Sequence, residues 1–399
     1  MMSFVILFQR ILRLHFKSIL NSYHPETLNH TTLSNIFRIL ERESKSTTYK
    51  FALLRGVIDI IQENSPYIEI IGSEVRIPLG LLVEKWLLYY YPIMESDDLI
   101  PQINGAGNKL AFTSEFVAVT RMYRDRRGLS AFYNDLKHLG FPEDARKPCN
   151  DLVKKIRDTI VKMPMKYIGS SVHGGHYSIF KPKVLPRQIL SIVDITFLIE
   201  TYGTFSIPIE YFNAFKEFGS FITGQDALLM KWAEFSVRAS EKPLSVEKVF
   251  NNVLKTPITD RDILRSKKLY ASILNKKGAV TCVWTGKSIA SYDIDHVIPF
   301  SIMKNNDLWN LLPAQASVNN LKRDKIPTPE LIHSRRESIL EYWSVINDSQ
   351  SHRFTKEIKV ALLGRYETDT WQTKGIEQLM STCDHLISAR GFQGWGGKT

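Results

Sequence analysis

The sequence predicts an α+β protein that is mostly helical and carries one small ββα module near its C-terminus. Three observations predict this fold class. Apolar residues recur at helical spacing along most of the chain, and strand-like alternation is confined to short stretches. One segment, residues 280–327, has the pattern of a hairpin, a loop and a short basic helix.

Residues 1–185 are expected to form an N-terminal helical or α+β domain. Its first twenty residues are apolar but are interrupted by Arg10, Arg13 and Lys17. This pattern favours an amphipathic helix over a signal peptide or a membrane span, so no membrane role is expected.

The next part of this domain predicts helix, hairpin and helix. Apolar spacing indicates a helix over 50–63, and a Gly-Ser turn divides 67–78 into two short strands. A helix over 81–91 is expected to end at Pro92. A winged helix, with the hairpin beside a DNA-reading helix, is an alternative to an ordinary α+β scaffold.

The rest of the domain combines helices with a glycine-rich stretch. Helical segments are expected over 111–140 and 150–163, and a strand over 177–180. His173 and His176 lie three residues apart, but no cysteine or acidic partner is close, so a turn is favoured over a metal site. Prolines and lysines near residue 185 predict a connector and a domain boundary.

Residues 186–255 predict a helical connector region, and residues 331–399 a helical C-terminal extension. The expected helices of these two regions and of the approach to the module are 189–202, 210–218, 226–240, 246–254, 260–274, 329–345, 355–366 and 376–390. The glycine-rich end of the chain, 392–397, is expected to be a loose tail.

The ββα module, within a predicted domain of residues 256–330, has a recognisable order of elements. Thr285-Gly286 marks a turn, and the alternating residues 292–295 predict a strand that ends near Pro299. A capped loop around Asn305 follows, and residues 317–325 predict a short, polar, basic helix.

The polar residues of this module suit phosphodiester hydrolysis, which needs a base for water and a cation near the phosphate. Histidine suits the base because its ordinary pKa lies near neutrality. Asp295 and Asn319 offer hard oxygen ligands of the kind that Mg²⁺ prefers. Asp295 and His296 are neighbours, so they serve one site only if the strand ends at them.

The segment resembles an HNH nuclease domain, a ββα-metal finger. It is most similar to the zinc-free branch that includes the HNH domain of the RNA-guided CRISPR effector nuclease. The matching residues are Asp-Ile-Asp-His-Val-Ile-Pro, Asn310, and Asn-Asn-Leu-Lys-Arg-Asp-Lys-Ile-Pro from Asn319. Asn310 follows His296 by 14 positions and Asn319 follows Asn310 by 9.

The resemblance assigns roles by position. It implies that His296 is the general base, that Asp295 and Asn319 hold Mg²⁺ or Mn²⁺, and that Asn310 braces the loop. Asn320 is a rival for the role of Asn319, but the N-x-x-K spacing to Lys322 favours Asn319.

Many HNH domains bind a structural zinc through two Cys-x-x-Cys pairs, and these pairs are missing here. Cys282 stands where the first pair begins, while Thr285, Gln315 and Val318 occupy the other positions. One thiol cannot build a tetrahedral site, so we predict no structural zinc and a finger held by apolar packing. The expected packing residues are Val280, Val283, Trp284, Ile289, Ile294 and Leu311.

The charge of the chain indicates a polyanionic partner. The net charge is +11, and residues 255–325 hold twelve Lys and Arg against six Asp and Glu. Such a concentration is typical of a nucleic-acid footprint. Lys322, Arg323 and Lys325 are expected to contact flanking phosphates. Three widely spaced cysteines favour a reducing cytoplasm over a disulfide scaffold.

Together these features predict a metal-dependent endonuclease that cuts double-stranded DNA in bacterial restriction or anti-phage defence, alone or with a protein partner. Two alternatives remain open from the sequence. One is a non-enzymatic nucleic-acid-binding or assembly subunit with a vestigial finger, and the other is a nuclease that cuts RNA.

Overall fold

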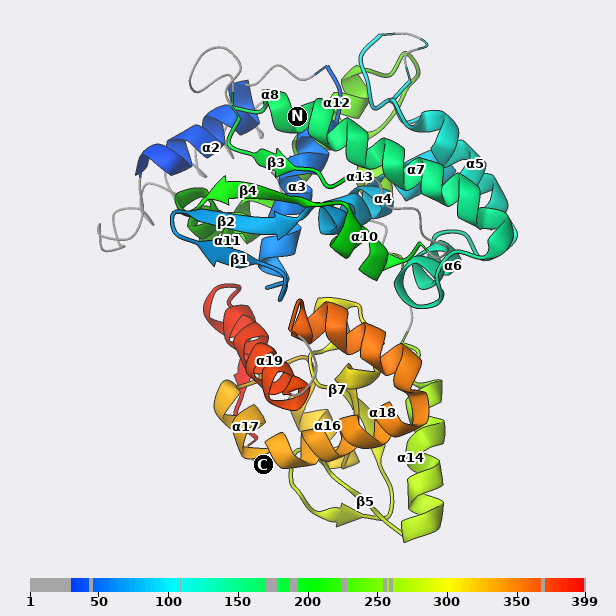
Figure 1. The fold of residues 1–399 in the computed structure, drawn as a ribbon, viewed down its shortest axis with the longest axis vertical. Helices are drawn as coiled ribbons and strands as arrows, with labels where there is room; N and C mark the ends of the chain where they lie inside the picture. The colour runs from blue at the N-terminus through cyan, green and yellow to red at the C-terminus, as the bar shows by residue number, and fades with distance from the viewer. Residues whose placement is uncertain are drawn as a thin grey trace.

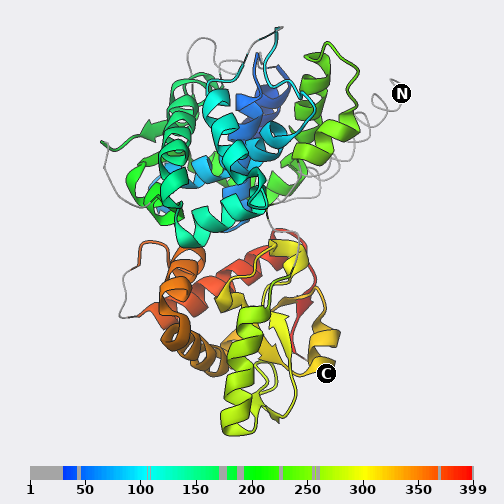
Figure 2. The same ribbon diagram turned by 90° about the vertical axis from the view of Figure 1, so that its right-hand side faces the viewer.

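The chain forms two lobes stacked along its long axis in the computed structural model (Figures 1 and 2). The described residues are 30–42, 46–105, 107, 109–169, 178–186, 193–223, 228–253, 257, 261–366 and 370–397. Each lobe has its own apolar core, one running from Leu33 to Val249 and the other from Tyr270 to Trp395. The predicted fold class, mostly helical α+β with a small module near the C-terminus, is confirmed.

The N-terminal lobe is a bundle of helices packed around one long buried helix, α4. Its helices are α2 (His30–Arg42), α3 (Tyr49–Gln62), α4 (Leu79–Glu95), α5 (Thr113–Arg124), α6 (Leu129–Asn134), the π-helix η1 (Asp135–Leu139), α7 (Glu143–Lys162), α8 (Pro164–Tyr167), α10 (Ile195–Thr201), α11 (Ile209–Thr223), α12 (Leu228–Arg238) and α13 (Val246–Val253). Helix α4 is apolar on nearly every side, which is typical of a helix at the centre of a core. A side chain at Gly80 would place its Cβ 2.1 Å from the Leu198 carbonyl, so only glycine lets α4 and α10 meet.

Four antiparallel strands cover one side of this bundle in the order β1-β2-β4-β3. They are β1 (Glu69–Ile71), β2 (Glu74–Pro78), β3 (Lys181–Lys183) and β4 (Thr204–Pro208). The predicted hairpin is therefore the edge of a larger sheet. Strand β4 pairs with both β2 and β3, so one core spans the boundary expected near residue 185.

Two local predictions in this lobe are wrong. Helix α4 continues through Pro92 to Glu95, because the buried faces of the helix hold it beyond the lost hydrogen bond. The strand expected at residues 177–180 lies at Lys181–Lys183, where the backbone pairs with β4. The histidine pair at residues 173 and 176 and the helix expected in the first twenty residues lie outside the described residues.

The C-terminal lobe holds the module and the helices that pack on it. Its helices are α14 (Leu264–Lys277), α15 (Phe300–Met303), the 3-10 helix η2 (Leu308–Asn310), α16 (Ala316–Lys322), α17 (Pro329–Ser334), α18 (Arg336–Ile358), the π-helix η3 (Lys359–Leu363) and α19 (Trp371–Ser388). Its strands are β5 (Val280–Thr281), β6 (Ser288–Ile289), β7 (Asp293–His296), β8 (Leu311–Ala314), β9 (Ile326–Pro327) and β10 (Gly394–Trp395). Strand β5 pairs with β6, and β7 with β8.

The end of the chain is docked onto this lobe, which corrects the expectation of a loose tail. Strand β10 pairs with β9, and Trp395 is buried against Trp284 with ring centroids 5.5 Å apart. The tail is ordered because its tryptophan supplies apolar area that the small finger otherwise lacks.

The three cysteines, Cys149, Cys282 and Cys383, are buried thiols, the first in the N-terminal lobe and the others in the C-terminal lobe. Burial raises the pKa of Cys149 and of Cys383 above the ordinary thiol value. Among the described helices, none is both long enough and apolar enough to cross a membrane.

Candidate active site

Strands β7 and β8 bring the motif residues together at the end of a short antiparallel ladder. Asp295 lies opposite Leu312, and His296 lies opposite Leu311 at the last pair of the ladder. Both polar side chains are almost fully buried, with 4% and 5% of their surface exposed. The apolar partner strand thus fixes the backbone of two polar neighbours at the last two positions of β7.

Asn310 clamps the chain immediately after His296. Its side-chain oxygen accepts a hydrogen bond from the Ile298 amide at 2.8 Å, and its Nδ2 donates to the Ile298 carbonyl at 3.0 Å. The Asn310 carbonyl also accepts from the Val297 amide at 2.8 Å. Because Asn310 is fully buried and these groups are paired, the clamp fixes the backbone that carries His296.

Both oxygens of Asp295 are engaged inside the protein. Oδ2 accepts a hydrogen bond from Trp284 Nε1 at 2.6 Å, and Oδ1 pairs with Lys322 Nζ at 3.0 Å. Burial raises the pKa of Asp295 above the ordinary carboxyl value, and the nearby Lys322 ammonium opposes this rise. The carboxylate is therefore held in one orientation beside a positive charge.

The position of Lys322 differs from the expectation of a phosphate contact. Its side chain is fully buried, and its ammonium donates to the His296 carbonyl at 2.6 Å as well as pairing with Asp295. The reason is that the last turn of α16 lies against β7. The other two expected phosphate contacts are more accessible: Arg323 is exposed and Lys325 is half-buried.

Asn319 lies on the same side of α16 as Lys322, because residues three apart share a helix face. Its side chain is partly exposed, whereas the rival Asn320 is exposed on another face. An amide oxygen from Asn319 and a carboxylate oxygen from Asp295 are hard donors, and an ion bound there would have to share the carboxylate with the Lys322 ammonium or displace it. This donor set fits a Mg²⁺ or Mn²⁺ ion.

His296 is held as a neutral imidazole. Its Nε2 lies 3.3 Å from Oδ1 of Asn306, a contact that is a hydrogen bond in the tautomer with the proton on Nε2 and the lone pair on Nδ1. Burial lowers the pKa of His296 to about 4, and the charges of Arg261 and Lys322 act in the same direction. The imidazole is thus ready to accept a proton at neutral pH.

Three further residues near His296 carry no motif that would have identified them. The Phe300 ring lies with its centroid 5.5 Å from that of His296. The Arg261 guanidinium carbon and the Lys304 ammonium lie 5.9 Å and 5.2 Å from the centre of the Phe300 ring. Both cations are exposed and lie against the Phe300 ring, which in turn packs on His296. Asn306 was also missed, since it lies outside the motif spacing.

Apolar packing holds the finger around the position where the zinc-binding branch has its first cysteine pair. Cys282 is fully buried, and its sulfur accepts a hydrogen bond from the Gln315 amide at 3.3 Å. Of the residues expected to pack the finger, four are buried and two, Ile289 and Ile294, are partly buried against the same core.

Comparisons with known proteins agree with the division into two lobes. A family model described as HNH endonuclease matches residues 282–328, so the resemblance stated above is confirmed. A second family model, described as a domain of unknown function (DUF8808), matches residues 29–253, which is more than half of the chain. This second match has nearly the bounds of the N-terminal lobe.

One relative has a curated name. CRISPR-associated endonuclease Cas9 from Listeria innocua serovar 6a is 30% identical to the chain over 98 residues. The aligned part is 23% of this chain and 7% of that protein, so the chain spans only a small share of the relative's length. No solved structure matches the chain at a significant level.

Proposed function

We propose, for a chain that belongs to the family of the domain of unknown function DUF8808 and carries an HNH endonuclease domain, that it cuts DNA by metal-dependent hydrolysis of phosphodiester bonds. One observation supports this most directly. A buried imidazole and a buried carboxylate belong to the last two residues of β7, which contacts the helix that carries Asn319.

In the proposed reaction His296 acts as the general base. Nδ1 takes a proton from a water molecule, and the hydroxide attacks the phosphorus opposite the bond to the 3′ oxygen. That P–O bond breaks, the 3′ oxygen takes a proton from solvent, and the products carry a 5′-phosphate and a 3′-hydroxyl. Asp295 and Asn319 would hold a divalent ion, which would supply positive charge near the crowded phosphate and the departing oxygen.

The surrounding residues have supporting roles. The Asn310 clamp and the Asn306 amide keep the imidazole in one orientation and one tautomer. We propose that Arg261, Lys304, Arg323 and Lys325 hold flanking phosphates, which position a substrate without reading its sequence. The first three are exposed and Lys325 is partly exposed.

We propose restriction or anti-phage defence as the setting, with the N-terminal lobe choosing the target or binding a partner. Support comes from the relative named as a CRISPR-associated endonuclease and from the small size of the finger, which leaves little surface for sequence recognition. Sequence-defined cuts by the protein alone would favour restriction. Cutting that begins only after a partner is added would favour an effector.

A second candidate is a nucleic-acid-binding subunit that does not cut. The observation that favours it is the complete engagement of Asp295 by Trp284 and Lys322, which leaves neither oxygen without a protein partner. An RNA substrate is a third outcome of the same experiment, because the imidazole does not read the sugar.

The test uses the purified full chain with Mg²⁺, with Mn²⁺ and with a chelator. The substrates are supercoiled plasmid, plain and methylated duplex DNA, single-stranded DNA and RNA, and the ends of the products are mapped. We expect metal-dependent cutting of duplex DNA with 5′-phosphate ends. Binding without cutting at every metal concentration would favour the second candidate.

The matched variants are His296→Ala and His333→Ala, the latter removing an exposed histidine of the same lobe. We expect the first to lower the cleavage rate by roughly 10²–10⁴-fold with DNA affinity nearly unchanged. The second should cut like the parent. Cutting at the parental rate by His296→Ala would remove this histidine from the mechanism.

A further inference from the structure

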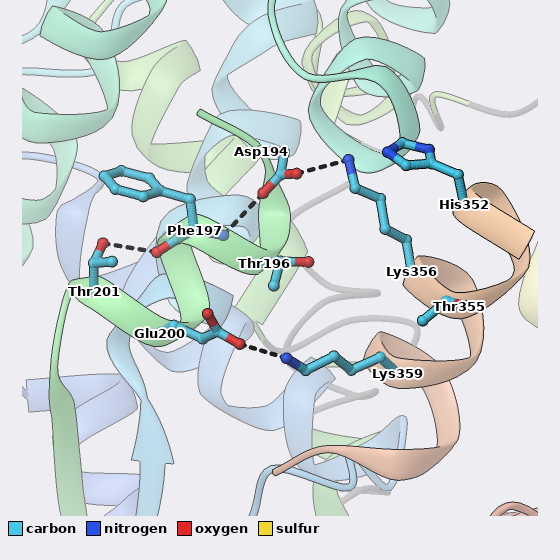
Figure 3. Close-up of a pocket in the computed structure, with 9 residues that line it drawn as sticks. All are labelled: Asp194, Thr196, Phe197, Glu200, Thr201, His352, Thr355, Lys356 and Lys359. Carbon is cyan, nitrogen blue, oxygen red and sulfur yellow. Dashed lines mark hydrogen bonds and ion pairs between the residues drawn. The ribbon is translucent and has the colours of Figure 1, made fainter. Parts of the chain in front are cut away.

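The two lobes meet along a seam that is crossed by ion pairs. Helix α10 faces the end of α18 and the start of η3 across a pocket of about 690 Å³. Figure 3 shows Lys356 paired to Asp194 and Lys359 paired to Glu200. Elsewhere on the seam Arg365 pairs with Glu69 at 2.8 Å. The pairs of Lys359 and Arg365 are partly exposed, so each contributes little to the attachment of the lobes.

The Lys137 ion pair is different because it enters the C-terminal lobe. Lys137 lies in the π-helix η1, and its ammonium contacts the two oxygens of Asp307 at 2.9 Å and 3.0 Å. The Asp307 side chain is 2% exposed and that of Lys137 is 12% exposed. Burial alone would raise the pKa of Asp307, but Lys137, His138 and Arg353 together outweigh it, with Lys137 the largest of the three, and the pKa ends below the ordinary value.

Asp307 is the anchor of a short segment, residues 305–310, which we call the catalytic loop. Its Oδ2 accepts hydrogen bonds from Asn305 Nδ2 at 3.0 Å and from Trp309 Nε1 at 3.3 Å. Its carbonyl accepts from the Asn310 amide at 3.0 Å. From α18, Glu357 accepts from the Leu308 amide at 2.6 Å. The conformation of this loop therefore depends on two buried carboxylates.

The catalytic loop contacts the imidazole at one point and the backbone that follows His296 at another. Asn306, directly before Asp307, meets Nε2 of His296, and Asn310 clamps Ile298 just after it. A shift of Asp307 would be transmitted to both contacts through the backbone of the loop, which Glu357, Trp343 and Arg353 also hold from within the C-terminal lobe. The path from the N-terminal lobe to the imidazole is thus Lys137, Asp307, the loop backbone and Asn306.

His138, Asp307 and Glu357 also place three donor atoms within 4.8 Å of one another, as a metal site would. Cations of the protein already occupy this neighbourhood, since Lys137 pairs with Asp307 and Arg353 with Glu357. A divalent ion would have to displace them, so the cluster is better explained as an internal charge network.

We propose that Lys137 is a positioning residue, through which the N-terminal lobe holds the catalytic loop and thereby His296 in its working geometry. The inference rests on the proposed nuclease function for its rate measurements. It gives the N-terminal lobe a second role beside target choice: the finger works at full rate only with that lobe seated on it.

The first experiment compares variants of the full chain. Lys137→Met removes the charge at nearly constant length, and Lys137→Arg keeps it. We expect Lys137→Met to lower kcat by about ten- to hundredfold with KM for DNA within twofold, and Lys137→Arg to recover most of the rate. Lys359→Met and Arg365→Met, which cut seam pairs that do not touch the loop, should keep the parental rate.

A double-variant cycle tests the route through Asn306. If Lys137 acts through this contact, Lys137→Met should slow Asn306→Ala much less than it slows the parent protein. Fully additive losses, or a loss from Lys359→Met equal to that from Lys137→Met, would overturn the proposal. If Lys137→Met does not fold, Lys137→Gln keeps one hydrogen-bond donor to Asp307 and takes its place.

A readout independent of cleavage separates the two hypotheses. We expect amide hydrogen exchange of Leu308 and Asn310 to quicken at least tenfold in Lys137→Met and to stay unchanged in Lys359→Met. Faster exchange in a protein that never cuts would retain the positioning role and remove the nuclease assignment. Unchanged exchange in a protein that cuts DNA would retain the nuclease assignment and remove the positioning role of Lys137.

Discussion

The two lobes bury different kinds of side chain. In the described part of the N-terminal lobe the core is apolar and aromatic, and the buried charged residues are Arg157 and Asp194 near its surface. The smaller C-terminal lobe buries Asp295, Asp307, Lys322 and Glu357 around its active site. The comparison teaches that the larger lobe is stabilised mainly by apolar burial. The smaller lobe buries paired charges in addition to its apolar core, which is typical of a functional site.

The aromatic residues illustrate the same difference. Trp86, Tyr90 and Tyr91 are fully buried and pack on one another or on Phe112 and Phe132. In the C-terminal lobe Trp284 packs against Trp395 and also donates a hydrogen bond to the Asp295 carboxylate.

The largest stability effect is expected where a buried charge loses its partner. Lys322→Met leaves the Asp295 carboxylate buried with Trp284 alone, and such a loss costs about 3–5 kcal/mol. Calorimetric unfolding of the C-terminal lobe measures it. We also expect Mn²⁺ to raise the melting temperature of this variant more than that of the parent, because a cation can then replace the ammonium.

The matched control is the double variant Lys322→Met/Asp295→Asn, which removes both charges. It should recover most of the lost stability while remaining inactive, since no isolated charge is left in the interior. A double variant as unstable as Lys322→Met would show that the lysine stem, and not its charge, stabilises the lobe.

The N-terminal lobe should respond to lost volume instead. Leu87 of α4 is fully buried in the aromatic core, so Leu87→Ala is expected to destabilise this lobe by about 2–4 kcal/mol through the cavity it leaves. Chemical denaturation measures the change. Metal ions should not alter it, in contrast to Lys322→Met, and an equal metal response in both variants would contradict the comparison.

The smallest effect concerns pH and Glu357. Burial, with Asp307 nearby, raises the pKa of Glu357 to about 7, although Arg353 opposes the shift. A carboxyl whose folded pKa is raised contributes stability below its ordinary pKa and loses it as pH rises through about 7.

The parent should therefore lose on the order of 1–3 kcal/mol from this group between pH 5 and 8. The groups that face Glu357 are Arg353, the Leu308 amide, Asp307 and His138, whose pKa burial lowers to about 3, so that it is uncharged across this range. Glu357→Gln is neutral throughout and should flatten this part of the profile, as thermal melts across the pH range can measure. An unchanged slope would assign the pH dependence to another group.

The sequence predicted the finger well because its information is local. Strand, turn and helix signals and the polar spacing from His296 to Asn319 all lie within a few turns of one another. The orientation of Lys322 did not follow from that spacing, since a basic helix has one face toward solvent and one toward β7, and only packing decides between them.

Long-range features were beyond the sequence signals. Strand β4 is five residues long, lies between two helices, and pairs with β2 about 130 positions earlier. Lys137 and Asp307 are 170 positions apart, so no periodic pattern joins them. The predictions for Pro92 and for the C-terminal tail were wrong for the same reason. Proline usually ends a helix and a glycine-rich segment is usually flexible, but at both places buried apolar contacts override this local preference.

The three buried thiols are distributed over both lobes, so their rates of alkylation report separately on the opening of each lobe. Cys149 is sealed in one lobe, and Cys282 and Cys383 in the other. An alkylating reagent reaches each sulfur only when the surrounding structure unfolds locally. The order in which the thiols are labelled therefore shows which lobe unfolds first. A substrate or partner that opens one lobe more than the other would increase the labelling of the cysteines in that lobe only.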